Sequence, residues 1–168
     1  MRSQEHGLIN SEPAFYMQQL TITEDYTLLK ECRVVVECTL ENVDIKKSVY
    51  DKIEAVISSD AILTSNTSAI PISILQKLTH VPGRFFGLHW AEPSHTTRFL
   101  EIICGELSDP ASAEFLYDLS HHWGKEPTLV RKDIRGFITN RLMYSMYREA
   151  MYLVENGENG FESIPACI

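Results

Sequence analysis

The sequence predicts an incomplete doubly wound α/β sheet followed by a long α-helix. Apolar runs typical of buried strands alternate with helical segments from residue 33 onward. The eight glycines are dispersed, and no GxGxxG loop joins a strand to a helix before residue 33, so we do not expect the first strands of such a sheet. The segment from about residue 135 to 156 is typical of a single helix much longer than the others.

The composition is that of a globular chain whose partners are small molecules or proteins. Hydrophobic residues make up 44% of the 168 residues and charged residues 23%, which is ordinary for a packed domain. The formal net charge of −8 argues against a nucleic-acid partner, because phosphate binding needs a basic face. No apolar run is long enough to cross a membrane, and the N-terminal residues lack the apolar core of a signal peptide, so we expect no membrane partner.

The cysteines and histidines indicate a reducing compartment and no metal site. The four cysteines form no CxxC pair, and three of them lie in or beside apolar segments. We therefore expect free thiols and a cytoplasmic location. The histidines other than His89 lack ligand spacing with Cys or Asp, which predicts that no metal is bound.

Local signals predict the elements of the first part of the chain. Residues 20–23 resemble a short strand, and the acidic segment 23–25 can cap a helix through Lys30. RVVVEC at 33–38 is β-branched and nearly continuous, which is typical of a parallel strand covered on both faces. The next helix, at 43–57, has apolar residues that approximate one stripe: Val43, Val49, Ile53, Val56 and Ile57.

The middle of the chain continues the alternation. A strand at 61–64 leads into the polar turn 65–68 and a short helix from about Pro71. Apolar runs at 85–88 and around Glu101 predict two more strands.

The C-terminal part is expected to end in a helix that needs a neighbour. A helix runs from about 110 to 123, a strand follows at 127–130, and Asp133 caps the helix at 135–156, which Gly157 ends. This last helix has two apolar stripes: Ile134, Ile138, Leu142, Met146, Ala150 and Leu153, and Phe137, Tyr144, Tyr147 and Met151. Because a helix that is apolar on more than one face packs on both sides, we expect a homo-oligomer through this helix or the rest of a larger protein.

Polar residues cluster where three successive predicted strands end. Glu41 and Asn42 follow the first strand, residues 65–68 follow the second, and His89 ends the third. Because the carboxyl ends of parallel strands meet at one edge of a sheet, one crevice can contain all three clusters.

Glu101 lies within the apolar run FLEII, where a carboxylate must be paired or hydrogen-bonded to be buried. The obvious partner is His89. The residues alone leave a second interpretation open, in which His89 is a structural histidine at a strand end and Glu101 is an exposed charge on an edge strand.

These residues carry a family resemblance. The sequence resembles the L-3-hydroxyacyl-CoA dehydrogenase family and its relatives that oxidise free hydroxy acids, from about residue 20 to 157. The shared motifs, in order, are VVVECTLENVDIKK, ILTSNTS, GLHW followed by EP, FLEII, GFITNR and REAMYLVENG. The resemblance implies a partial NAD-binding Rossmann-like domain without its Gly-rich loop at 1–132, and the start of a helical dimerisation domain at 133–168.

The resemblance also implies an activity and a catalytic pair. The family uses NAD to interconvert 3-hydroxyacyl-CoA and 3-oxoacyl-CoA, and His89 and Glu101 match its catalytic pair. Histidine suits proton transfer in both directions, because its unperturbed pKa lies near neutrality. A carboxylate that receives one ring N–H fixes the tautomer and stabilises the imidazolium.

Further site residues are implied by position. Ser68 and Asn140 match the family residues that contact substrate beside the histidine, and Glu41, Lys46 and Asn66 match positions that line its NAD site. Ser68, Asn140, Glu41 and Lys46 also have plainer interpretations, respectively as a turn serine, a surface asparagine, a helix-start acid and a solvated lysine.

The sequence departs from the family in two places. Trp90-Ala91-Glu92-Pro93 replaces a common Phe-Phe-Asn-Pro, which adds a carboxylate beside the site, and Ile134-Arg135 replaces Thr-Pro. Arg98 and Arg135 can then bind a substrate carboxylate or CoA phosphates, or else balance nearby surface acids.

Two alternatives to a 3-hydroxyacyl-CoA dehydrogenase stay open. One is a free hydroxy-acid dehydrogenase of the same superfamily. The other is a gene fragment, frameshift product or degenerate homologue that is inactive alone and associates through its last helix, since no Gly-rich loop is present to bind the pyrophosphate.

Overall fold

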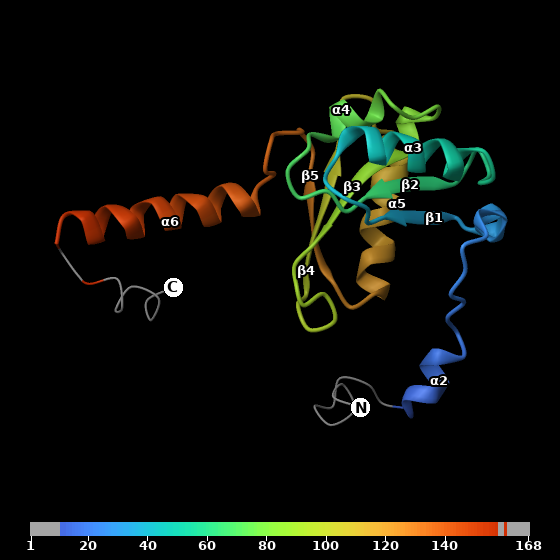
Figure 1. Ribbon diagram of the computed structural model, residues 1–168, viewed down its shortest axis with the longest axis horizontal. Helices are drawn as coiled ribbons and strands as arrows, with labels where there is room; N and C mark the ends of the chain where they lie inside the picture. The colour runs from blue at the N-terminus through green and yellow to red at the C-terminus, as the bar shows by residue number, and fades with distance from the viewer. Residues whose placement is uncertain (1–10, 158–159, 161–168) are drawn as a thin grey trace.

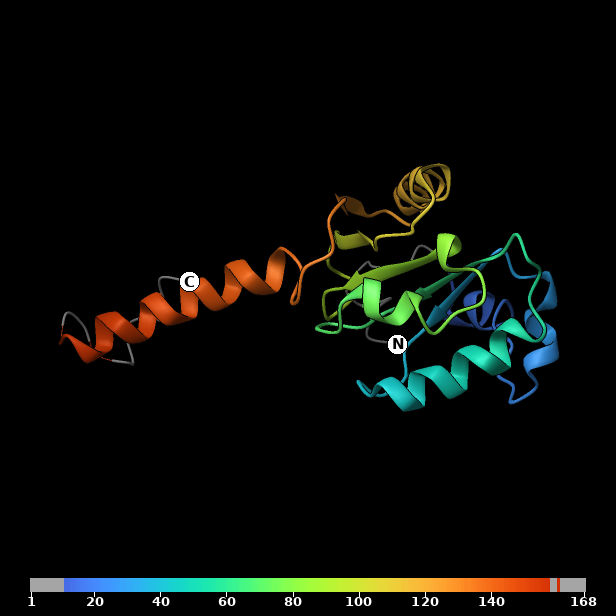
Figure 2. The same ribbon diagram turned by 90° about the horizontal axis from the view of Figure 1, so that it is seen from above.

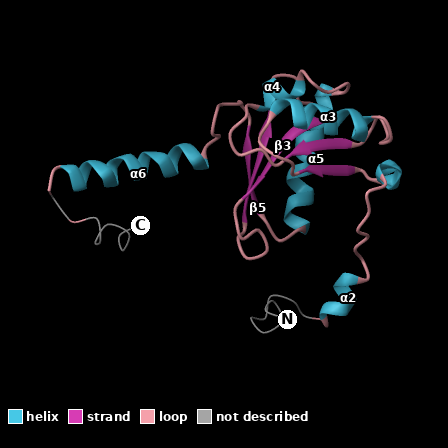
Figure 3. Cartoon of the chain, viewed as in Figure 1, coloured by secondary structure: helices cyan, strands magenta, loops and turns pink. Residues whose placement is uncertain are grey.

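The computed structural model describes residues 11–157 and 160, which form a five-stranded sheet with helices on both faces and a long final helix (Figures 1 and 3). The strands are β1 (Val34–Glu37), β2 (Ile62–Ser65), β3 (Phe85–Trp90), β4 (Phe99–Cys104) and β5 (Glu126–Val130). The helices are α2 (Pro13–Met17), α3 (Val43–Glu54), α4 (Ile72–Gln76), α5 (Pro110–His122) and α6 (Thr139–Glu155), with 3₁₀ segments η1 (Tyr26–Glu31) and η2 (Pro82–Arg84). The predicted fold class is confirmed.

The sheet is mixed, with its strands in chain order. β1, β2 and β3 are parallel, as predicted, so their carboxyl ends share one edge. β4 runs antiparallel to β3, and β5 runs parallel to β4. The connection at 91–98 contains no helix, and a connection this short reverses the chain, since a parallel crossover needs about a dozen residues or more.

Two apolar clusters lie on opposite faces of the sheet. Figure 2 shows α5 on one side and α3 with α4 on the other. The first cluster comprises Val35, Tyr50, Ile53, Leu63, Ile72, Leu75, Phe85, Ile103, Val130 and Phe137. The second comprises Ile62, Phe86, Leu88, Leu100, Ile102, Ala113 and Leu116. Burial on both faces explains why the strand sequences are nearly continuous apolar runs.

The strand predicted at 20–23 is wrong. No strand forms there, and Ile22 is 92% exposed, because no neighbouring strand pairs with this segment. The predicted cap is correct in position but begins a 3₁₀ turn rather than an α-helix. The Asp25 side chain accepts a hydrogen bond from Thr27 N at 2.9 Å at the start of η1.

The buried face of α3 differs from the predicted stripe. The helix ends at Glu54, and its buried residues are Lys46, Tyr50 and Ile53, whereas Val43 is exposed. The apolar pattern was misleading because the buried face includes a lysine that pairs with a buried carboxylate, described below.

The start of α6 also differs from the prediction. Asp133 does not cap this helix, because its carboxylate accepts hydrogen bonds from Ser73 N and Oγ at 2.7 and 2.8 Å. The helix begins later, at Thr139, and extends away from the sheet (Figure 1). None of its residues is buried. Gly157, with φ of 70°, follows its end as predicted.

Along the described residues, no helix combines the length and apolar character needed to span a membrane.

Candidate active site

His89 and Glu101 are opposite each other in the antiparallel pairing of β3 and β4. His89 Nδ1 lies 2.8 Å from Glu101 Oε2, and the exposed fractions of the two residues are 7% and 0%. Because β4 lies between β3 and β5, Glu101 is not an exposed charge on an edge strand. The predicted partnership of these two residues is confirmed.

The second oxygen of Glu101 caps α6. Oε1 accepts hydrogen bonds from Ile138 N at 3.1 Å and from Thr139 N and Oγ1 at 3.0 and 3.2 Å. Burial alone would raise the pKa of this carboxyl, but the hydrogen bonds from His89 and the start of α6 hold its pKa below the ordinary value. An ionised Glu101 accepts from the Nδ1–H of His89, which leaves Nε2 as the ring nitrogen available for chemistry.

Two aromatic rings fix the plane of the His89 ring. Phe99 meets it edge-on with centroids 5.8 Å apart, and Phe137 lies at 5.4 Å. Phe137 has a φ of 52°, which is unfavourable for a bulky side chain and persists here because the ring is fully buried. The backbone before α6 is thus shaped to support the histidine.

A cavity of about 990 Å³ adjoins His89. Its walls come from the ends of β1 and β2, from the loop after β3 and from the first turn of α6. The lining residues are Val36, Cys38, Asn66, Ser68, His89, Trp90, Ala91, Glu92, Pro93, Ser94, His95, Phe99, Thr139, Asn140 and Met143. The predicted crevice at the carboxyl ends of the strands is therefore present for two of the three polar clusters, whereas Glu41 and Asn42 do not line it.

Three of the predicted site residues meet at this cavity. Asn140 donates from Nδ2 to the backbone oxygen of Ser68 at 2.8 Å, which connects α6 to the turn after β2. Asn66 accepts from Trp90 N at 3.2 Å, which connects that turn to β3. The structure thus brings Ser68, Asn140 and Asn66 together with His89.

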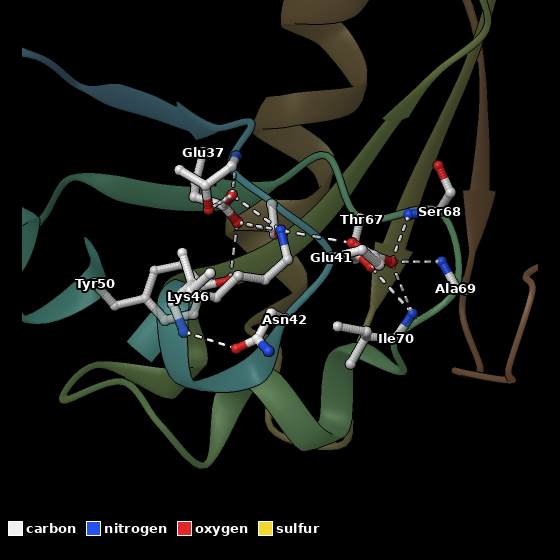
Figure 4. Close-up of polar contacts among 12 residues, drawn as sticks. Glu37, Glu41, Asn42, Lys46, Tyr50, Thr67, Ser68, Ala69 and Ile70 are labelled. Carbon is white, nitrogen blue, oxygen red and sulfur yellow. Dashed lines mark hydrogen bonds and ion pairs between the residues drawn. The ribbon is translucent and has the colours of Figure 1, made fainter. Parts of the chain in front are cut away.

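A buried carboxylate that sequence analysis missed lies at the end of β1. Glu37 accepts from Lys46 Nζ at 2.9 Å on both oxygens, from Ser65 Oγ at 2.6 Å and from Tyr50 Oη at 3.1 Å (Figure 4). Burial opposes ionisation, but the hydrogen bonds from Ser65, Thr39 and Lys46 hold the pKa of Glu37 below its ordinary value. Like Glu101 within FLEII, Glu37 within VVVE is a carboxylate in an apolar run. That pattern indicates a buried carboxylate that needs a partner.

Glu41 is held at the turn after β2. Its Oε1 accepts from the Thr67 hydroxyl and from the backbone N–H groups of residues 68–70 at 3.2, 3.0 and 3.3 Å (Figure 4). Its other oxygen lies 3.7 Å from Lys46 Nζ. Glu41 and Lys46 do not line the cavity at His89. They form a polar connection from the buried Glu37 to the turn that carries Ser68.

The two predicted substrate arginines lie in different surroundings. Arg98 is exposed and pairs with Glu126 at 2.8 Å, and the structure does not bring it to the cavity at His89. Arg135 lines a neighbouring cavity together with Ser68 and Asn140.

The described residues contain no group of three or more His, Cys, Asp or Glu side chains arranged to hold a metal ion. Cys38 is the cysteine that lines the cavity at His89. Burial and the nearby charge of Glu37 raise the pKa of its thiol, so Cys38 is protonated at neutral pH.

Comparison with known proteins identifies the family. The model of the 3-hydroxyacyl-CoA dehydrogenase NAD-binding domain matches residues 1–134. The chain belongs to this family.

Two curated relatives show the range of the family. A 5-formyl-3-hydroxy-2-methylpyridine 4-carboxylate 5-dehydrogenase from Mesorhizobium japonicum is 39% identical over 135 residues, which are 80% of this chain and 44% of that protein. A probable 3-hydroxybutyryl-CoA dehydrogenase from Deinococcus radiodurans is 30% identical over 153 residues, which are 91% of this chain and 55% of that protein. The chain thus spans about half the length of the curated relatives it matches.

A solved structure confirms the fold. The (S)-3-hydroxybutyryl-CoA dehydrogenase from Ralstonia eutropha is 28% identical and superposes with a TM-score of 0.87, covering 96% of this chain and 56% of that one.

The cavity at His89 fits part of the NAD that this dehydrogenase family binds. It lies at the carboxyl ends of β1, β2 and β3, where open α/β sheets bind their ligands. Asn66 presents a side-chain amide at its wall, a group that suits the carboxamide of a nicotinamide.

Proposed function

We propose that this chain carries the acid/base centre of an NAD-dependent oxidoreductase that interconverts a 3-hydroxyacyl-CoA and a 3-oxoacyl-CoA. The observation that carries the proposal is the buried His89–Glu101 pair at the wall of a cavity at the carboxyl ends of β1–β3. Membership of the 3-hydroxyacyl-CoA dehydrogenase family and the relatives named 3-hydroxybutyryl-CoA dehydrogenases support the substrate class.

His89 is the proton-transfer group in this proposal. In the oxidation direction its Nε2 accepts the proton of the substrate hydroxyl, and in the reduction direction the protonated ring donates to the carbonyl oxygen. Glu101 holds Nδ1–H, keeps Nε2 free and stabilises the imidazolium that forms. When bound, NAD supplies the acceptor and donor of the hydride.

The remaining site residues position substrate and cofactor. Ser68 and Asn140 contact the substrate oxygen beside His89, and Asn66 holds the nicotinamide end of NAD. Glu41 and Lys46 lie on the cofactor side of the site and stabilise it through the turn at 67–70. Glu41 accepts hydrogen bonds from three backbone N–H groups of that turn.

A fluorescence titration of the purified chain with NADH tests the proposal. Trp90 lines the cavity, and its ring lies 5.7 Å from that of Trp123, so energy transfer from these rings reports bound nicotinamide. We expect saturable binding in the micromolar range, followed by NADH oxidation when acetoacetyl-CoA is added. Absence of binding up to millimolar NADH would contradict the function for this chain.

A second candidate is a dehydrogenase of free hydroxy acids. Arg135 lies beside Ser68 and Asn140, where a substrate carboxylate could bind, and the 39% identical relative is named for a pyridine carboxylate. Comparing turnover of acetoacetyl-CoA with that of small 3-oxo acids separates the two candidates. A preference for the thioester supports the first, and no such preference supports the second.

A third candidate is a non-catalytic chain that associates through α6. Residues 133–168 then begin a helical dimerisation domain, and exposed apolar residues of α6 pair with a second copy. The exposed apolar residues of α6 are Leu142, Tyr144, Met146, Tyr147, Met151, Tyr152 and Leu153. Sedimentation of the purified chain as a well-behaved monomer would contradict this association.

A further inference from the structure

The two oxygens of the Glu101 carboxylate have separate hydrogen-bond partners. Oε2 lies 2.8 Å from His89 Nδ1, whereas Oε1 accepts from Ile138 N, Thr139 N and Thr139 Oγ1. The exposed fraction of Glu101 is 0%, so water does not reach the carboxylate to replace a lost donor. The last torsion of a glutamate side chain is broad. The donors at Oε1 therefore determine how the plane of the carboxylate lies relative to the imidazole.

Thr139 supplies two of the three donors to Oε1. Its backbone N lies 3.0 Å and its hydroxyl oxygen 3.2 Å from Oε1. The backbone donor is present with any residue except proline, whereas the hydroxyl depends on the amino acid at position 139. Threonine hydroxyls in helices commonly bond to a carbonyl one turn earlier, but this one donates to a carboxylate on β4. The identity of the first residue of α6 thus affects the partner of His89.

Other titratable side chains lie at the same cavity but do not hold Glu101. Cys38, Glu92 and His95 line the cavity at His89, and within the described part of the chain none of them forms a hydrogen bond with Glu101. Thr139 lines this cavity too, so direct contact with a substrate is the alternative role for its hydroxyl. The hydrogen bond to Glu101 favours a role through the carboxylate.

We propose that Thr139 is a positioning residue whose hydroxyl acts on His89 through Glu101. By holding Oε1, the hydroxyl turns Oε2 toward Nδ1, so the neutral imidazole keeps its proton on Nδ1 and leaves Nε2 free to accept a proton from the substrate. The inference rests on the proposed oxidoreductase function and adds a positioning residue to its acid/base pair.

Nitrogen-15 NMR of the imidazole rings in the full chain without NADH tests this proposal, because it reports which ring nitrogen carries the proton and needs no turnover. A His89→Gln variant identifies the signals of His89. Thr139→Val removes the hydroxyl and keeps the β-branched shape, whereas Thr139→Ser keeps the hydroxyl. The matched control is Thr79→Val, which removes a hydroxyl that bonds to the backbone oxygen of Gln76 at 2.9 Å, away from the cavity at His89. Circular dichroism verifies that each variant folds.

We expect the neutral His89 ring to carry its proton on Nδ1 in the parent chain, in Thr139→Ser and in Thr79→Val. In Thr139→Val the population that carries the proton on Nε2 should rise. Steady-state kinetics with NADH and acetoacetyl-CoA provide the second measurement. Turnover of Thr139→Val should fall by about tenfold, the effect of losing one hydrogen bond to a charged group, while the KM for acetoacetyl-CoA stays unchanged.

Three results would overturn the proposal. The first is a proton position in Thr139→Val that matches Thr79→Val, and the second is equal impairment of Thr139→Val and Thr139→Ser. The third is a raised KM with unchanged turnover in Thr139→Val, which would indicate direct contact with the substrate. A parent chain without NADH binding or turnover would instead contradict the oxidoreductase function, and the NMR comparison would still decide the role of Thr139.

Discussion

Glu101 holds His89 with one carboxylate oxygen and the start of α6 with the other. The distances are 2.8 Å from Oε2 to His89 Nδ1 and 3.0 Å from Oε1 to Thr139 N. The residue that fixes the histidine tautomer therefore also fixes the position at which α6 begins. The orientation of the histidine and the placement of the wall that carries Asn140 are consequently coupled.

Replacing Glu101 should impair turnover more than cofactor binding. Glu101→Gln removes the charge that stabilises the imidazolium and weakens the cap of α6, while Glu101 itself does not line the cavity. We expect turnover to fall by a factor on the order of 10² or more, because the equivalent change in other catalytic pairs has effects of this size or larger. Steady-state kinetics together with the NADH titration measure both quantities.

The matched control is Glu126→Gln, which makes the same substitution at an exposed carboxylate that pairs with Arg98. Turnover of this control should stay within about twofold of the parent, as expected for a surface ion pair. If Glu101→Gln behaved like Glu126→Gln, the orienting role of Glu101 would be wrong.

Breaking the buried Glu37–Lys46 ion pair beside β1 should lower the free energy of unfolding more than breaking an exposed ion pair. Lys46→Met leaves the Glu37 carboxylate buried without its cation, which should lower the free energy of unfolding by about 3–5 kcal/mol. Lys47→Met is the neighbouring control, because Lys47 is exposed and pairs with Asp51 one turn along, and its loss should cost less than about 1 kcal/mol. Urea denaturation measures both.

The double variant Glu37→Gln with Lys46→Met provides a second criterion. Removing both charges should recover part of the stability lost in Lys46→Met, since neither ion is then left unpaired. Equal losses in Lys46→Met and Lys47→Met would show that the buried pair contributes nothing beyond a surface pair.

The free energy of unfolding should decrease as the pH is lowered below about 4.5. The pKa values of Glu37, Glu41 and Glu101 all lie below their ordinary value of 4.5 in the fold. Near and below pH 4.5 the folded chain therefore binds fewer protons than the unfolded chain. The stabilisation that these three carboxylates contribute is complete above pH 4.5, and it is lost as the pH falls through their pKa values in the folded chain. The urea concentration at the midpoint of unfolding should decrease as the pH is lowered. The decrease should be shallower in Glu37→Gln than in the parent chain. Midpoints that do not change with pH would contradict this reasoning.

The sequence predicts the site residues that can be recognised within a single strand. The end of one apolar run indicates His89, and a carboxylate within another indicates Glu101 and its need for a partner. The antiparallel register that pairs the two residues is seen only in the structure. Glu37 carries the same signal at the end of VVVE, but its partner Lys46 lies on a helix whose apolar pattern does not place a lysine on the buried face.

Contacts between distant segments could not be predicted locally. Asp133 has the position of a helix cap, yet it binds Ser73, and the cap of α6 comes from Glu101. Likewise, residues 20–23 have strand character but no strand beside them. In each case a tertiary partner, rather than local propensity, determines the structure.

The central claim is that His89 transfers the proton in an NAD-dependent reaction. NADH oxidation by the parent chain, by His89→Gln and by the surface control His121→Gln, each with NADH affinity measured in parallel, tests it most directly. We predict that His89→Gln lowers turnover by about 10²–10⁴, the range for general acid/base groups, with NADH affinity unchanged and His121→Gln like the parent. A loss of less than about tenfold in His89→Gln would contradict the assignment of His89 as the acid/base.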